Sequence, residues 1–149
     1  MTAGGGVRGE SFSQKTVWEW MAALERLPNV YVATKLPPDL KAELERHARP
    51  RYWDEPLKIP RERLLREIGD AEGLIVPGGL PVDRELLAAA PRLRAVSTVS
   101  VGYNHFDLAA MRERGVVGTH TPHVLDDTVA DLVLALMLAA ARPIPELDA

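Results

Sequence analysis

Short apolar runs alternate with segments of helical periodicity along most of the chain. A short apolar run bounded by turn residues is typical of a buried strand, and apolar positions three or four apart indicate one face of a helix. Proline, aspartate and glycine mark the boundaries of several of these segments, with Asp83 and Asp107 predicted as helix N-caps and Gly115 as the end of the helix that follows Asp107. The pattern predicts strands at 30–34, 51–53, 73–76, 93–98 and 116–119, helices beginning near 38, 60, 84 and 108, and a long helix over 127–142.

Strands separated by helices pair in parallel through right-handed crossovers. The predicted strands are too continuously apolar for a sheet with one face in water, so we expect helices on both faces. The predicted fold class is therefore α/β: a flavodoxin-like, open, parallel five-stranded sheet of order 2-1-3-4-5, followed by a long C-terminal helix.

Residues 1–28 do not join this alternation, and we expect a flexible or extra N-terminal segment there, with a short helix over 14–27. Gly4, Gly6 and Gly9 spell G-x-G-x-x-G. That fingerprint binds a dinucleotide only between a strand and a helix, and three residues cannot form the strand, so we reject it. One hypothesis is that the natural start is Met21.

Composition narrows the functional classes. The length of 149 residues suits about one domain, and the net charge of −3 disfavours a nucleic-acid partner. The absence of cysteine excludes disulfides and thiolate chemistry. The longest apolar run, 132–141, is too short to span a membrane. No signal-type segment is evident, so we expect a cytoplasmic protein.

Ligands of such sheets bind outside the carboxyl ends of the strands, near the point where the strand order reverses. The most informative loop there is 99–104, where Gly102 lets the backbone turn sharply. The amides of Val101 and Gly102 could then form a nest for a small carboxylate. The alternative is a plain turn in which glycine relieves backbone strain.

Two other loops lie at the same edge. Gly78 and Gly79 either let a substrate approach the backbone or form an ordinary type II turn after Pro77. Lys35 either offers a cation to an acid or is a solvated side chain.

Polar residues near the C-terminal helix have simpler interpretations. His120 and His123 form an incomplete metal site, because zinc needs at least three protein ligands. Asp126 and Asp127 precede an apolar helix, which favours N-capping and stabilisation of the helix dipole.

Four segments carry a family resemblance. They are S-V-G-Y-N-H-F-D-L at 100–108, R-G-V-V at 114–117, T-P-H-V-L-D-D-T at 121–128 and A-D-L at 130–132. They resemble the D-isomer-specific 2-hydroxyacid dehydrogenases, and most closely the glyoxylate/hydroxypyruvate reductase branch. The resemblance implies a substrate-binding domain over 29–125, and over 126–149 an interdomain helix leading to an NAD(P)-binding domain that these residues do not contain.

The same resemblance implies roles for individual residues. Val101 and Gly102 would bind the carboxylate of a small 2-oxo or 2-hydroxy acid, and the loop Gly78-Gly79-Leu80 would line the pocket. Val101 and Thr128 would lie near the nicotinamide of NAD or NADP. Asn104, where relatives often carry aspartate, would shape the loop.

The family's cofactor domain and its downstream Arg, Glu and His are missing from the sequence. We therefore expect reduction of a 2-oxo acid to a D-2-hydroxy acid by the complete enzyme, but no activity from this chain alone. The apolar helix over 127–142 would lose part of its cover, which favours self-association. Two alternatives are a non-enzymatic carboxylate-binding or scaffolding module, and a half-enzyme completed by a separately encoded cofactor domain.

Overall fold

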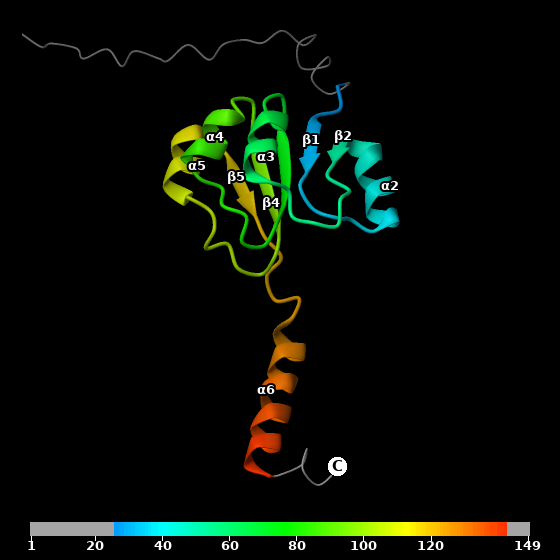
Figure 1. Cartoon of the computed structure of the whole chain (residues 1–149), viewed down its shortest axis with the longest axis vertical. Coiled ribbons are helices and arrows are strands. Elements are labelled where there is room, and N and C mark those ends of the chain that lie inside the picture. The colour runs from blue at the N-terminus through cyan, green and yellow to red at the C-terminus, as the bar shows by residue number, and fades with distance from the viewer. Residues whose placement is uncertain (1–25, 143–149) are drawn as a thin grey trace, which may run out of the picture.

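The computed structural model describes residues 26–142, and its centre is one parallel sheet (Figure 1). The strand order is β2-β1-β3-β4-β5, and every neighbouring pair is parallel. This confirms the fold class and strand order predicted from the sequence. The strands are β1 (Asn29–Val32), β2 (Arg49–Tyr52), β3 (Gly73–Pro77), β4 (Ala95–Val99) and β5 (Val117–Thr119).

The helices connect successive strands and divide between the two sides of the sheet. Helix α3 packs against α4, and α4 packs against α5, so these three form one layer. Because the chain runs from β1 to β2 in the opposite direction to the later crossovers, right-handed connections place α2 on the other side, beside β2. The bounds are α2 (Pro38–His47), α3 (Arg61–Glu67), α4 (Arg84–Ala89), α5 (Leu108–Arg114) and α6 (Asp126–Ala141).

The core lies between the sheet and the layer of α3, α4 and α5. Tyr31, Leu74 and Val96 are in register on neighbouring strands and are at most 2% exposed. The next position in this row is Gly118 on β5. A Cβ atom there would lie 3.0 Å from the ring of Phe106, so the aromatic side chain occupies the space that a larger residue would need.

The opposite face is covered unequally in residues 26–142. In the next row, Val32 is fully buried, Ile75 and Ser97 are half-buried, and Thr119 is exposed. Helix α2 itself contains no buried residue. The expected helices on both faces are therefore present, but burial decreases from β1 towards β5.

Three predicted helix boundaries are confirmed in detail. The Asp83 carboxylate caps α4 by accepting from the Leu86 amide at 2.9 Å, and Asp107 caps α5 by accepting from the Ala110 amide at 2.9 Å. Helix α5 ends at Gly115, whose φ of 66° is the left-handed conformation that glycine adopts without strain.

The prediction that Asp126 or Asp127 caps the last helix is wrong. Helix α6 begins at Asp126, its N-cap is Leu125, and no side chain caps it. Asp126 instead accepts a hydrogen bond from His123 Nδ1 at 2.7 Å. Both aspartates lie in the first turn, where their charge still faces the positive end of the helix dipole.

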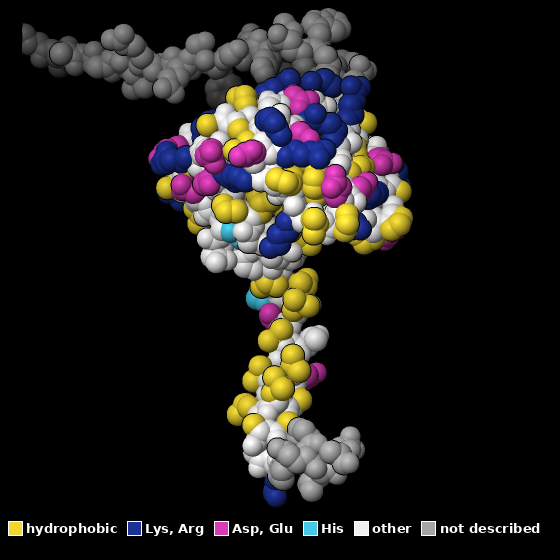
Figure 2. Space-filling view, in the orientation of Figure 1, with side chains coloured by type: hydrophobic (Ala, Val, Ile, Leu, Met, Phe, Trp, Pro, Cys, Tyr) yellow, Lys and Arg dark blue, Asp and Glu magenta, His cyan; other side chains and the backbone are white. Residues whose placement is uncertain are grey.

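Helix α6 projects away from the sheet and, within the described residues, packs against none of the other elements (Figures 1 and 2). Neither α6 nor any other described helix is long and apolar enough to cross a membrane. The expected cytoplasmic location stays a prediction. The large apolar side chains of α6 are between 49% and 64% exposed: Val129, Leu132, Val133, Leu134, Leu136, Met137 and Leu138.

Several predictions concern residues outside 26–142. They are the flexible tail, the Gly4-Gly6-Gly9 pattern, the Met21 start and nearly all of the helix over 14–27. The end of the interdomain segment, 143–149, also lies outside the described residues.

Candidate functional site

The loop after β4 holds three successive carbonyl groups on protein donors. The carbonyl of Ser100 accepts from the Thr121 amide at 3.0 Å. The carbonyl of Val101 is bound by His120 Nδ1 at 2.8 Å, and that of Gly102 by Ser100 Oγ at 2.7 Å. This loop is not helical, and its backbone orientation is therefore fixed by contacts with both flanking segments.

The held carbonyls also fix where the amides of Val101 and Gly102 point. In a planar trans peptide, the N–H group points opposite to the carbonyl of the preceding residue. The Val101 and Gly102 amides are therefore aimed away from Thr121 and His120, respectively. No acceptor for either amide is found among residues 26–142. Two successive unpaired donors on an exposed loop are suited to binding an anion.

Glycine at position 102 is not required by the fold. Among the described glycines only Gly79 and Gly115 have positive φ, so Gly102 adopts a conformation open to other residues. A Cβ atom there would meet only Asn104 Oδ1, at an ordinary 3.4 Å. The relief of backbone strain considered above is thus not the reason for glycine. The missing side chain leaves the backbone of this loop open to close approach.

The Gly78-Gly79 segment forms a turn, as one of its two predicted interpretations required. The Leu80 amide donates to the Pro77 carbonyl at 3.4 Å, and the φ of 81° at Gly79 is typical of the third position of a type II turn. A Cβ atom on Gly78 would lie 3.0 Å from Cβ of Ser100. Glycine at position 78 therefore lets the loops after β3 and β4 come into contact.

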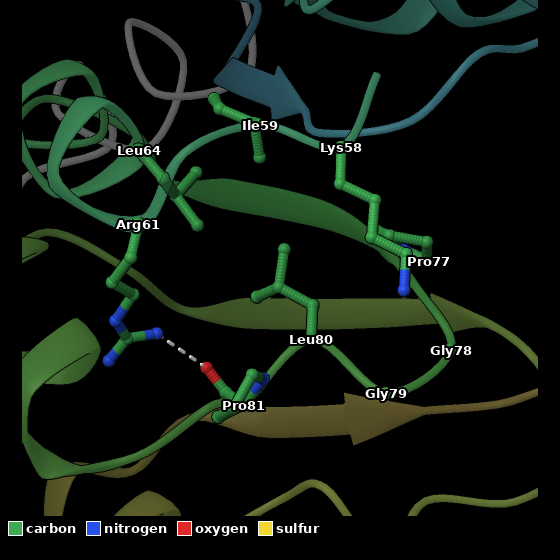
Figure 3. Close-up of a pocket in the computed structure, with 9 residues that line it drawn as sticks. All are labelled: Lys58, Ile59, Arg61, Leu64, Pro77, Gly78, Gly79, Leu80 and Pro81. Atoms are coloured by element: carbon green, nitrogen blue, oxygen red, sulfur yellow. Dashed lines mark hydrogen bonds between the residues drawn. The ribbon is translucent and has the colours of Figure 1, made fainter. Parts of the chain in front are cut away.

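The turn residues also line a small cavity of ≈ 170 Å³ (Figure 3). The side chain of Leu80 points towards Ile59 and Leu64, which makes the wall largely apolar. Val101 and Gly102 do not line this cavity, and Thr128 lies on the projecting helix α6. The structure thus brings the two glycine loops together but does not place all the predicted site residues around one cavity.

Lys35 lines a second cavity of ≈ 180 Å³, together with Pro77 and Trp53. It therefore lies near the reversal of strand order between β1 and β3, as expected. The sequence did not single out Trp53, whose Nε1 donates to the Leu57 carbonyl at 2.7 Å and so orders the connection to α3.

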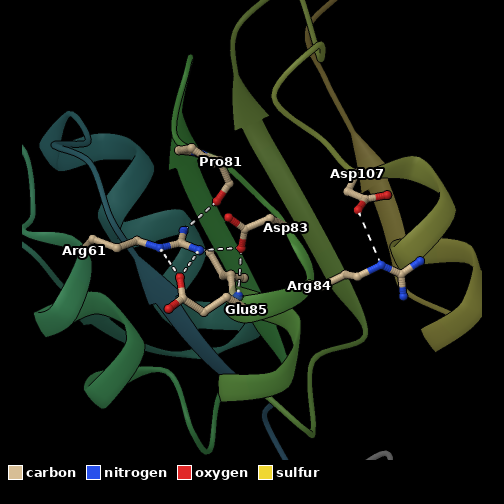
Figure 4. A network of polar contacts seen from close by, with 7 residues as sticks. Arg61, Pro81, Asp83, Arg84, Glu85 and Asp107 are labelled. Carbon is tan, nitrogen blue, oxygen red and sulfur yellow. Dashed lines mark hydrogen bonds and ion pairs between the residues drawn. The ribbon is translucent and has the colours of Figure 1, made fainter.

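Arg61 organises the segment after the glycine turn and was also missed (Figure 4). Its Nη1 donates to the Pro81 carbonyl at 2.8 Å, and its Nη2 pairs with Asp83 and, at 3.0 Å, with Glu85. Burial alone would raise the pKa of Asp83, but the hydrogen bond from the Leu86 amide and the Arg61 guanidinium lower it overall. The charged network therefore joins α3 to the start of α4.

A buried polar chain supports the loop after β4 from within. Thr98, 1% exposed, lies 2.8 Å from Ser100 Oγ and 3.1 Å from His105 Nε2, measured from its Oγ1. Burial lowers the pKa of His105 below its ordinary value. The polar pair Ser97-Thr98 within a strand that is apolar on either side was the available sequence signal for this network.

His120 and His123, which precede α6, do not point towards a common site. His120 binds the Val101 carbonyl, whereas His123 binds Asp126. Within residues 26–142 there is no group of three or more His, Asp or Glu side chains placed to hold a metal ion.

The helix N-termini of the described residues do not suit the pyrophosphate of a dinucleotide. That group needs free amides after a glycine turn, without a competing negative charge. Helices α2 and α3 begin after prolines 37 and 60, and α4 and α5 are capped by Asp83 and Asp107. Helix α6 carries two aspartates in its first turn. No helix N-terminus among residues 26–142 therefore offers a site for the pyrophosphate of NAD(P).

Residues 30–141 match the family model described as "D-isomer specific 2-hydroxyacid dehydrogenase, catalytic domain". The chain belongs to this family. It is 42% identical over 120 residues to a glyoxylate/hydroxypyruvate reductase B from Yersinia pestis, an alignment that covers 80% of this chain and 36% of the relative. The chain thus spans about a third of the length of this curated relative.

Solved structures agree with the family assignment. A protein from Thermus thermophilus matches with a TM-score of 0.68 and 39% identity, over 79% of this chain and 38% of that one. An NADPH-dependent glyoxylate/hydroxypyruvate reductase from Sinorhizobium meliloti, solved with NADP and malonate, matches with a TM-score of 0.62 and 29% identity, over 81% and 36%.

Proposed function

We propose that residues 29–125 are the substrate-binding domain of an NAD(P)-dependent D-2-hydroxyacid dehydrogenase of the glyoxylate/hydroxypyruvate reductase type. In the complete enzyme the reaction is reduction of a small 2-oxo acid to a D-2-hydroxy acid. The amides of Val101 and Gly102 bind the carboxylate, and Gly78, Gly79 and Leu80 form the neighbouring wall. The observation that carries this proposal is the pair of amides without an acceptor among residues 26–142, beside a glycine that the fold itself does not require.

The amide pair supplies binding and orientation. Hydrogen bonds to a charged group contribute about 1.5–3 kcal/mol each, so two of them support a dissociation constant on the order of 1 mM. Fixing the carboxylate end also fixes the position of the 2-oxo carbon, which is the protein's main contribution to a cofactor-dependent reduction. In the complete enzyme we also propose, from the family resemblance, that Thr128 and Val101 lie near the nicotinamide.

We further propose that residues 126–149 form the interdomain segment of the complete enzyme, and that the 149 residues alone do not turn over substrate. The support is that no described helix N-terminus suits pyrophosphate. The exposed apolar side chains of α6 favour association of the 149-residue chain with a second copy of itself through this helix.

A carboxylate-binding module without catalysis is the second candidate. It is favoured by the fact that the amide pair and all its supporting contacts lie within the described residues. NAD(P)H oxidation by the purified chain with glyoxylate or hydroxypyruvate separates activity from binding alone. We expect no oxidation above background, and turnover would overturn the proposed inactivity.

Binding itself is tested by titrating ¹⁵N-labelled chain with malonate and following the backbone amide resonances. We expect the largest shifts at Val101 and Gly102. Gly102→Ala has room for its methyl group but places it beside the amides, so it should keep the fold and weaken binding about tenfold. Shifts confined to other regions, or no shift at high malonate concentration, would refute the proposed site.

A further inference from the structure

The hydrogen-bond chain beneath the loop after β4 can run in only one direction. The carbonyl of Gly102 can only accept, so Ser100 Oγ donates its single proton to it. Ser100 must then accept from Thr98 Oγ1, whose proton is thereby used. Thr98 Oγ1 must in turn accept from Nε2 of His105. The His105 ring therefore carries a proton on Nε2.

His120 is held in the opposite form. Its Nδ1 lies 2.8 Å from the Val101 carbonyl, which can only accept, so the proton is on Nδ1. The ring also packs against Tyr103, with centroids 4.9 Å apart, which limits its rotation. His120 thus binds the Val101 carbonyl directly. His105 acts on the next carbonyl, that of Gly102, through the hydroxyl groups of Thr98 and Ser100.

We propose that His120 and His105 are positioning residues, held in opposite tautomers: His120 aims the Gly102 amide towards a bound carboxylate, and His105, through Thr98 and Ser100, fixes the next peptide plane and so holds Gly102 from its other side. The inference rests on the proposed function of this loop. A carbonyl held by a donor fixes the whole peptide plane, and the N–H group on its other side then points away from that donor. Neither histidine touches the carboxylate, and each acts through the backbone.

The environment of each ring fits this role. His105 is part-buried, and burial lowers its pKa, which favours the neutral ring with a single proton. Its neighbour Phe106 meets it edge-on, with centroids 4.8 Å apart. Orientation fixed before binding reduces the ordering cost of the loop when the ligand arrives.

Long-range ¹H–¹⁵N correlation spectra of the histidine rings test the tautomers directly, without any ligand. We expect the Nε2–H form at His105 and the Nδ1–H form at His120. The second is more diagnostic, because neutral imidazole in water favours Nε2–H. The exposed His47 and His123 serve as internal references. The reverse tautomer at either positioning residue would overturn the proposal.

Paired substitutions test the consequence for binding. His120→Phe keeps a ring against Tyr103 but removes the donor, whereas His120→Asn retains an amide donor. We expect malonate affinity to fall about five- to tenfold in the first and to be largely preserved in the second. Thr98→Val breaks the inner chain with little change in volume, and Thr98→Ser keeps the hydroxyl group. The valine variant should also lose the defined tautomer at His105.

The outcomes separate the two proposals. The wild-type chain could show the expected tautomers while malonate leaves the amide resonances of Val101 and Gly102 unchanged. In that case the proposed carboxylate site is wrong, and the histidines have no ligand-positioning function. If wild-type chain binds malonate there and both His120→Phe and Thr98→Val bind equally well, the positioning role is wrong and the carboxylate site stands. Dispersed amide spectra of each variant establish that the fold is intact.

Discussion

Arg61 on α3 donates a hydrogen bond across 2.8 Å to the backbone carbonyl of Pro81, directly after the glycine turn of the site. The same guanidinium pairs with Asp83, which caps α4. One side chain thus links the wall of the cavity to the helix that follows it.

Arg61→Met should destabilise the fold by about 1–2 kcal/mol, because it leaves the Pro81 carbonyl and Asp83 without their cationic donor. Urea unfolding followed by circular dichroism measures the loss. Arg84→Met is the matched control, since the Arg84–Glu113 pair is exposed at both ends and is expected to contribute less than about 1 kcal/mol. Equal losses in the two variants would contradict a special role for Arg61.

Asp83 should contribute to the pH dependence of stability. Its pKa in the folded protein is lowered from 3.8, so the stabilisation is present above about pH 4 and is lost as pH falls through the folded value. Because the side chain is 45% exposed, solvent screening keeps the effect below about 1 kcal/mol. Asp83→Asn retains a capping oxygen but does not titrate. Its free energy of unfolding should therefore fall less steeply than that of the wild type as the solution is acidified from neutral pH.

Asp107→Asn is the control for that experiment. Asp107 also caps a helix, but its nearest cationic contact is Arg84 at 4.0 Å. If the acid-dependent loss of unfolding free energy becomes less steep to the same extent in both variants, the effect comes from helix capping in general and not from the Arg61–Asp83 pair.

Two glycine substitutions should differ sharply in stability. Gly115→Ala forces a side chain into the left-handed conformation at φ 66° and should cost roughly 1 kcal/mol. Gly102→Ala meets neither strain nor crowding and should change the free energy of unfolding by less than about 0.5 kcal/mol. Differential scanning calorimetry measures both, and a large loss at position 102 would mean that the fold, and not a ligand, requires that glycine.

The exposed apolar face of α6 should make the 149-residue chain self-associate in a concentration-dependent way. A double substitution, Leu132→Lys with Leu136→Lys, places two charges on surface that is 57% and 60% exposed in one copy. Light scattering after size exclusion should show a shift towards monomer in this variant. A monodisperse wild-type monomer at high concentration would contradict the prediction.

Local signals made the fold predictable from the sequence. The strands and helices follow from periodicity within a few residues, and the Asp83, Asp107 and Gly115 boundaries depend only on their neighbours. Strand β2 began earlier than predicted, at Arg49, because an edge strand tolerates residues that a central strand rejects. Helix α6 begins at Asp126, one residue before the predicted start at 127.

The candidate site was only partly predictable. A glycine in the loop after β4 pointed to Val101 and Gly102, but the contacts that aim their amides come from Thr121 and His120, and Thr98 holds the next carbonyl through Ser100. Such contacts join separate segments and have no periodicity to detect. His120 was instead considered as a metal ligand, since sequence spacing does not reveal which backbone group a side chain meets.

The two edge strands of the sheet, β2 and β5, have features that hinder pairing with strands of other chains. Strand β2 carries arginine at positions 49 and 51 with a proline between them, and β5 is only three residues long. The charged side chains of β2 and the missing amide donor of its proline discourage addition of a foreign strand at that edge, and the short length of β5 does the same at the other. Growth of the sheet into fibrillar aggregates is therefore disfavoured at both edges.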